Sequence, residues 1–265
     1  MPVTDGWVNL NIAGLPWQRQ VAEKVFHRPI DEVVRKTSPD ELVAMMDEAG
    51  VDRAIVGVHG EAPDRALLAA ADRLSGRLAL AVDLDPRRGM KAVRAFDALV
   101  KNHRAVTARL MPCLVGAPPD DRIYYPIYTK AVELGVPVCV TVGLPAPPLP
   151  GRCQDPIALD DVCLFFPELT VVMANGADPW WDVAIRQMGR FPRLHLMTSA
   201  WSPRRLPPSL LAFMNGRGAD QIVFGTDFPF LTFDRCLAEA RALELGEGVL
   251  DKYLHGNAAR LFGGL

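Results

Sequence analysis

The chain has 265 residues, which is long for one β-sandwich and close to the ~250 residues typical of one α/β barrel. Hydrophobic residues make up 49% of it and charged residues 23%, so a packed core is available. The net charge of −2 excludes the broad cationic surface by which proteins bind nucleic acid or anionic membranes.

No signal peptide is expected at the N-terminus, which has neither a basic segment nor an apolar one. No apolar run approaches the length of a membrane span. The five cysteines show no metal-binding or CxxC spacing, so we expect reduced thiols in a cytoplasmic protein.

The first 50 residues contain a short strand, an irregular segment and a helix. Residues 7–10 are strand-like, and residues 11–37 form an irregular stretch that is long for a loop. Long loops in compact domains are often functional. Ser38 as N-cap, with Glu41 three residues later, predicts a helix over residues 38–49. Gly50 is placed to end that helix.

From residue 53 onward, apolar segments alternate with helical ones. The further strands are predicted at residues 53–58, 78–84, 105–111, 137–142, 169–174, 194–199 and 221–226. The further helices are predicted at residues 64–74, 90–101, 125–134, 160–166, 181–189, 207–215, 234–245 and 249–262. Strands that are apolar on both faces, and separated by helices, are typical of parallel sheets.

Eight such strands predict a single (β/α)8 TIM barrel over residues 1–265, with C-terminal closing helices. A doubly wound open sheet is the alternative, although the glycine fingerprint that usually follows its first strand is missing.

Polar and aromatic residues collect at the predicted C-terminal strand ends, where barrel enzymes place their active sites. The candidate site residues are Trp7, Asn9, His59, Arg109, Thr141, Asn175, Trp180, Ser199 and Asp227. Several aromatic residues in the nearby loops fit a flat, apolar or aromatic substrate, and equally fit ordinary packing.

Five motifs occur in order along the chain. They are GVDRAIV at 50–56, YYPIYTKAVELGVPVCVTVG at 124–143, FPELTVVMANGADPWWD at 166–182, FGTDFP at 224–229 and HGNAARLFG at 255–263. Together they resemble the amidohydrolase-related metal-dependent hydrolases and decarboxylases. That barrel family includes aminocarboxymuconate-semialdehyde decarboxylase and 2-pyrone-4,6-dicarboxylate lactonase.

The resemblance breaks at the metal ligands. The family's first strand ends in Asp-x-His-x-His, and two later strands each supply a histidine. The corresponding positions here are Trp7, Asn9, Thr141 and Asn175, so only the acid of the eighth strand, Asp227, remains. This donor set is poor for Zn²⁺, which prefers imidazole, carboxylate or thiolate ligands. We therefore expect no catalytic metal and no other cofactor, with a weak non-zinc metal as a minor alternative.

The remaining candidates leave several roles open. Asp227 is the expected general acid or base, with a pKa raised among neutral groups or lowered if Arg109 pairs with it. Arg109 either holds a substrate carboxylate or forms a salt bridge. The amide and hydroxyl groups either orient a substrate carbonyl or bond one another. Ser199 has no histidine partner for a catalytic triad, and His59 has ordinary packing or surface exposure as its alternative role.

The resemblance, taken with the missing metal ligands, implies a metal-independent member of this barrel family. We expect a hydrolase of a lactone, ester or amide, or a lyase that decarboxylates or rearranges its substrate. The substrate is expected to be a small carbonyl compound or aromatic carboxylate. The alternative is an inactive barrel that binds a ligand or acts as the structural partner of an active homologue. The oligomeric state stays open between a monomer and the homodimer common in this group.

Overall fold

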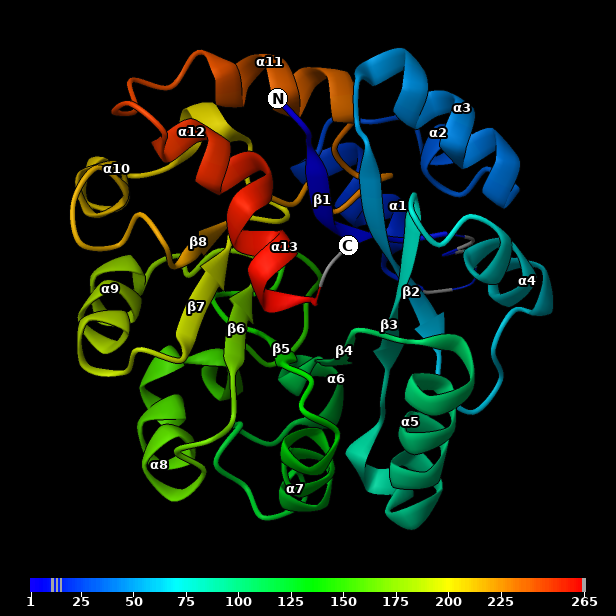
Figure 1. Ribbon diagram of the computed structural model, residues 1–265, viewed down its shortest axis with the longest axis vertical. Helices are drawn as coiled ribbons and strands as arrows, with labels where there is room; N and C mark the ends of the chain where they lie inside the picture. The colour runs from blue at the N-terminus through cyan, green and yellow to red at the C-terminus, as the bar shows by residue number, and fades with distance from the viewer. Residues whose placement is uncertain (11, 13, 15, 264–265) are drawn as a thin grey trace.

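The computed structural model describes residues 1–10, 12, 14 and 16–263 (Figure 1). Within them, eight parallel strands form one sheet in which the spatial order is the order along the chain. They are β1 (Thr4–Val8), β2 (Arg53–His59), β3 (Leu78–Asp83), β4 (Thr107–Leu110), β5 (Val138–Thr141), β6 (Val171–Ala174), β7 (Leu194–Met197) and β8 (Ile222–Val223). This confirms the predicted (β/α)8 architecture.

The first and last strands meet and bring the sheet close to a closed barrel. A parallel bridge joins Val8 to Phe228. The Gly6 amide donates to the Phe224 carbonyl at 3.0 Å, and the Asp227 amide donates to the Trp7 carbonyl at 3.0 Å. The ends of β1 and of the segment after β8 are therefore held side by side.

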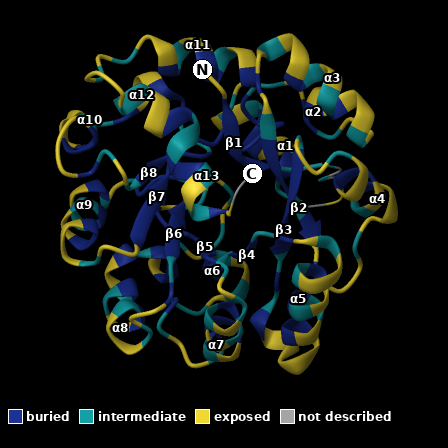
Figure 2. Ribbon diagram, viewed as in Figure 1, coloured by how far each residue is buried: buried dark blue, intermediate teal, exposed yellow. Residues whose placement is uncertain are grey.

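Helices surround the sheet, with their buried faces against the strands and their exposed faces outward (Figure 2). The longer ones are α3 (Pro39–Ala49), α4 (Arg65–Arg73), α5 (Met90–His103), α7 (Tyr125–Leu134), α8 (Leu159–Phe165), α9 (Trp181–Arg190), α10 (Pro208–Met214) and α11 (Phe233–Arg241). The predicted capping box of α3 is present, since Ser38 and Glu41 bond each other's backbone amides. Gly50 ends α3 in the left-handed conformation, with φ 78°.

Several short elements differ from the prediction. The segment expected to be irregular contains α1 (Gln18–Gln20), a π-helical turn (Val21–Val25) and α2 (Ile30–Val33), while positions 11, 13 and 15 lie outside the described residues. A short helix, α6 (Pro112–Val115), follows β4. The closing helix predicted at residues 249–262 is present as one continuous helical run, made of α12 (Val249–Asp251), a π-helical turn (Lys252–Gly256) and α13 (Asn257–Leu261).

One cluster of side chains inside the barrel is apolar. Trp7 packs there with small side chains that include Ala79, Ala81 and Ala174. Ala258 of α13 and the neighbouring Phe262 join the same cluster, so the C-terminal segment closes one end of the barrel (Figure 1). Across the part of the chain that the structure describes, none of the helices combines the length and apolar character required to cross a membrane.

Candidate active site at the C-terminal ends of the strands

Asp227 stands directly beyond β8 in an unusual backbone conformation. Its φ is 69°, in the left-handed region that aspartate and asparagine tolerate better than most residues. Asn175, beyond β6, has φ 66°. Strained backbone of this kind collects at functional sites, so both strand ends are candidates on geometric grounds.

The carboxyl group of Asp227 is nearly buried, and its residue is 9% exposed. Burial raises its pKa from 3.8 to about 7. A hydrogen bond from the Asn9 side chain to Oδ1, at 2.7 Å, and the positive charge of Arg109 both lower the pKa, while the charge of Asp5 raises it. The result is a group that is partly protonated near neutral pH.

Arg109, on β4, is fully buried. Its Nη1 donates to the Asn9 side-chain oxygen at 3.1 Å and to the Val8 carbonyl at 3.3 Å, and its Nη2 donates to the Ile55 carbonyl at 2.8 Å. Its Cζ lies 4.0 Å from the centroid of the Trp7 ring. The guanidinium thus bonds neutral oxygens, and within the described residues it forms no salt bridge with a carboxylate.

Asn9 connects the arginine to the acid. Arginine carries only hydrogen-bond donors, so the amide oxygen of Asn9 faces Arg109 and its NH₂ group faces Asp227. Asn9 therefore donates to the Asp227 carboxyl group in an orientation that Arg109 fixes. Trp7 and Asn9 lie on the same side of β1, as the strand period predicts, because both contact Arg109.

Asp83, the last residue of β3, is a site residue that the sequence analysis missed. A Cβ atom placed on Gly57 would lie 2.5 Å from Arg109 Nη1 and 2.9 Å from Asp83 Oδ2, so both charged groups lie close to the face of Gly57 where a side chain would stand. Burial raises the pKa of Asp83, and the positive charge of Arg109 opposes the rise. The signal was present in the sequence, since Asp83 lies at the C-terminal end of a buried apolar segment, as Asp227 does.

Asp5 is a second buried acid that was not singled out. It accepts hydrogen bonds from the Trp7 amide at 3.0 Å, the Thr226 amide at 3.0 Å and the Thr226 hydroxyl at 2.6 Å. Burial raises its pKa to about 6, against the lowering effect of these bonds. Asp5 joins β1 to the segment that carries Asp227.

The other candidates have partners of their own. Ser199 Oγ donates to Asn175 Oδ1 at 2.8 Å, and Thr141 Oγ1 donates to Gln154 Oε1 at 2.7 Å. His59 is exposed at the end of β2, where its Nδ1 accepts from the Ala62 amide at 3.1 Å. Trp180 is half-buried just before α9. Among the described residues, no hydrogen bond joins these side chains to Asp227.

Residues 23–264 match the family model described as Amidohydrolase. The chain belongs to this amidohydrolase family. A search of curated proteins found no match to this chain.

Solved structures share the fold of this family member at low sequence identity. An uncharacterized TIM-barrel protein from Bordetella bronchiseptica is 21% identical, with a TM-score of 0.80 and 98% of each chain covered. The 5-carboxyvanillate decarboxylase of Sphingomonas paucimobilis is 14% identical, with a TM-score of 0.73 and 98% of each chain covered. The 2,6-dihydroxybenzoate decarboxylase from Rhizobium is 17% identical, with a TM-score of 0.71 and coverage of 99% of this chain and 98% of that one.

The side chains of this amidohydrolase-family site do not fit a metal ion. Within the described residues, no three His, Cys, Asp or Glu side chains are grouped so that they could hold one. The guanidinium of Arg109 already contacts Trp7 and Asn9, two of the positions that correspond to family ligands. A divalent cation placed there would meet an indole and a fixed positive charge, with one carboxylate and one carboxamide as its oxygen donors. That donor set is poor for Zn²⁺ and weak for Mg²⁺ or Ca²⁺.

Proposed function

We propose that this chain is a metal-independent enzyme in which Asp227 transfers a proton to or from a small carbonyl compound or aromatic carboxylate. The observation that carries the proposal is the place of Asp227, which is buried beyond the C-terminal end of β8 and accepts a hydrogen bond from Asn9 at 2.7 Å. Burial there raises its pKa to about 7. A general acid or base is most effective when its pKa lies near the working pH. The names of two structural neighbours, both aromatic-acid decarboxylases, favour the carboxylate among the substrates.

Decarboxylation requires only a proton donor in this geometry. Protonated Asp227 gives its proton to the ring carbon that bears the carboxylate. The electrons of the carbon–carbon bond then return to the ring as CO₂ leaves, and Asp227 takes a new proton from water. In a hydrolysis, ionised Asp227 would instead remove a proton from the attacking water. Arg109 acts through Asn9 in both cases, since its charge and the Asn9 bond limit how far the pKa of Asp227 rises.

A second candidate is a non-catalytic barrel that binds a ligand or supports an active homologue. The close packing of the candidate residues favours it, because Trp7 is 3% exposed, Thr141 3% and Ser199 0%. A cavity of about 220 Å³ lies at the ends of β2 and β3 against His59 and Asp83, but Asp227 does not line it.

The two candidates are separated by assaying 2,6-dihydroxybenzoate in the presence of EDTA and following its loss by ultraviolet absorbance. We expect turnover that EDTA does not change and that Asp227→Asn lowers on the order of 10²–10⁴-fold. Asp161→Asn, which changes an exposed acid of α8, is the matched control and keeps the parent rate.

Full activity in Asp227→Asn removes this residue from the mechanism. A rate that appears only with added Mn²⁺ contradicts metal independence. Saturable binding of the acid without turnover, across hydroxylated benzoates, lactones and esters, supports the non-catalytic barrel.

A further inference from the structure

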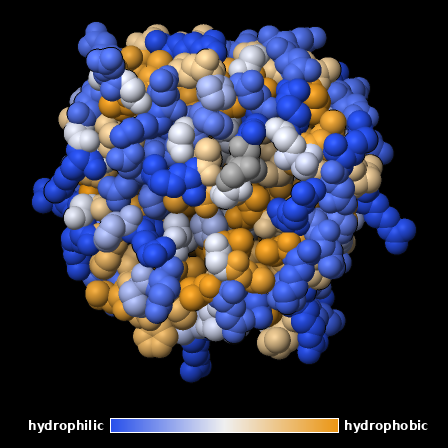
Figure 3. Space-filling view, viewed as in Figure 1, coloured by the Kyte–Doolittle hydropathy of each residue, from blue (hydrophilic) through white to orange (hydrophobic). Residues whose placement is uncertain are grey.

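A cavity of about 660 Å³ opens at the end of the barrel opposite Asp227. Pro137, Thr170, Arg193 and Gln221 line it, and each stands immediately before one of the strands β5 to β8. Figure 3 views this side of the molecule, where apolar side chains gather just below the centre of the face and hydrophilic ones border them. The cavity walls include Val132, Val136, Leu169 and Leu261.

His195 of β7 forms part of the lining and is only 6% exposed. Burial, and then the positive charge of Arg260, lower its pKa to about 4, so the ring is neutral at physiological pH. Its Nδ1 is buried and has no hydrogen-bond partner among the described residues. A buried polar atom without a partner is uncommon, and is one mark of a place where a ligand or water belongs.

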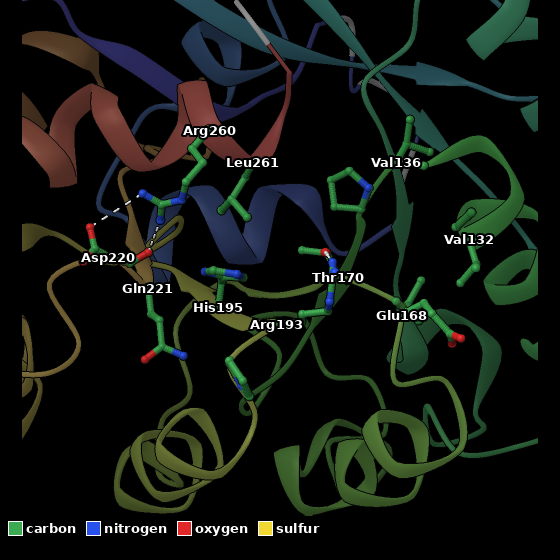
Figure 4. Close-up of a pocket in the computed structure, with 15 residues that line it drawn as sticks. Val132, Val136, Glu168, Thr170, Arg193, His195, Asp220, Gln221, Arg260 and Leu261 are labelled. Atoms are coloured by element: carbon green, nitrogen blue, oxygen red, sulfur yellow. Dashed lines mark hydrogen bonds and ion pairs between the residues drawn. The ribbon is translucent and has the colours of Figure 1, made fainter.

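Two arginines stand on either side of this histidine (Figure 4). The described hydrogen bond of Arg193 goes to a neutral group, Thr170 Oγ1, at 3.4 Å. Arg260 Nη1 lies 3.6 Å from Asp220 Oδ1, but Asp220 also pairs with Lys252 at 3.0 Å. The Glu168 carboxylate points away from His195 in Figure 4. The cavity therefore offers cationic groups that its own acids do not fully neutralise.

We propose that this cavity is a second ligand site, specific for a small organic anion with a carboxylate head and an apolar body. The carboxylate bonds Arg193, with Arg260 adding to the positive potential. Guanidinium groups suit carboxylates because their paired N–H donors match the two oxygens. The apolar body packs against Val136 and Leu261, and His195 meets a polar substituent. A volume of about 660 Å³ is within the usual range for small-molecule sites. This site does not depend on the chemistry proposed for Asp227.

The test uses benzoate as the probe and ¹H–¹⁵N NMR of the full chain. We expect saturable shifts in residues 131–137, 168–170, 192–195 and 260–261. Arg193→Gln should weaken the binding about tenfold, because it removes a charge-assisted hydrogen bond. The matched control is Arg186→Gln on α9, which changes an exposed arginine outside the cavity and keeps the parent affinity. Benzyl alcohol, the neutral analogue, should bind more weakly than benzoate.

Three results would overturn the site: no saturable shifts, shifts confined to residues 57–61, 83–88 and 225–229 at the other end, or equal binding to Arg193→Gln and the parent. His195→Phe tests the role of the imidazole ring separately from the positive charge of the two arginines. It should shift selectivity toward benzoate over 4-hydroxybenzoate, because phenylalanine offers no nitrogen to a polar substituent. Unchanged selectivity removes His195 from the proposed site.

Discussion

The acid and the cation of the candidate site are adjacent but not in contact. Arg109 reaches Asp227 through the Asn9 amide, so the carboxyl group gains one strong hydrogen bond and only part of the electrostatic benefit of a direct pair. Desolvation is then the larger effect, and the pKa rises to about 7. A direct salt bridge would have lowered it and left an acid unsuited to proton transfer near neutral pH.

This raised pKa predicts how stability depends on pH. The folded state keeps the Asp227 proton up to about pH 7, whereas an unfolded chain releases it near 3.8. The resulting stabilisation is complete below about pH 4 and is lost as the pH rises to about 7. Asparagine does not titrate, so the unfolding free energy of Asp227→Asn does not fall in this way as the pH rises. Relative to the parent, the variant should become more stable between about pH 4 and 7, by about 2–4 kcal/mol in all.

Urea unfolding at a series of pH values measures the difference. Asp5 is present in both proteins, so only the part of its titration that is coupled to Asp227 contributes to the difference. The gain should grow between about pH 4 and 7 and then level off. A difference that does not change with pH would mean that Asp227 titrates with an ordinary pKa.

Gly57 makes room for the buried guanidinium. Any Cβ there would lie 2.5 Å from Arg109 Nη1, so Gly57→Ala must displace the arginine and disturb Asn9. We expect a loss of about 1–3 kcal/mol, typical of overpacking. Gly76→Ala is the matched control, because a Cβ there meets nothing within 4 Å, and it should change stability by less than about 0.5 kcal/mol. Chemical denaturation of both variants gives the comparison, and equal effects would refute the steric argument.

The contact between β1 and the segment that follows β8 positions Asp227. β8 pairs with β7 over only two residues, and much of its attachment to β1 comes from Thr226 and Asp5. The Thr226 hydroxyl donates to Asp5 and accepts from the Phe228 amide at 2.9 Å, so one side chain fixes both ends of the turn around Asp227.

Thr226→Val should therefore destabilise the protein by about 1.5–3 kcal/mol, because it removes a bond to a buried carboxyl group. Faster hydrogen exchange at the Asp227 and Phe228 amides should accompany the loss. Thr129→Val, an exposed change on α7, is the control for the substitution itself. Unchanged exchange at the turn would show that Thr226 does not hold it.

The sequence predicted the order of these elements because apolar runs and capping residues mark strands and helices locally. It misplaced the first strand, expected at residues 7–10 and found at Thr4–Val8, because the buried Asp5 made a core segment look like surface. The sequence placed Asn9 and Asp227 at the C-terminal strand ends, but it did not predict the hydrogen bond between them. The position of the Arg109 head group could not be deduced, since it depends on the space that Gly57 leaves inside the barrel.

On the scale of the whole molecule, the two ends of the barrel differ in charge and in depth. The C-terminal end encloses a buried cation with three acids whose pKa values are raised, Asp5, Asp83 and Asp227. The N-terminal end has a larger cavity in which arginines stand at the rim. The buried guanidinium of Arg109 makes the C-terminal end unsuited to a metal ion. Added metal is therefore not expected to stabilise the folded chain.

A native-state metal site would raise the melting temperature when metal is added. One with a Kd of ~10 µM would stabilise the fold by ~2.7 kcal/mol in ~1 mM Mn²⁺. For a chain of this size that corresponds to roughly 5–10 °C. Because Arg109 repels a cation and the donors are poor, we expect the melting temperature to be the same in EDTA and in Mn²⁺. Differential scanning calorimetry measures it. A rise with Mn²⁺ in the parent that disappears in Asp227→Asn would show that Asp227 binds a metal after all.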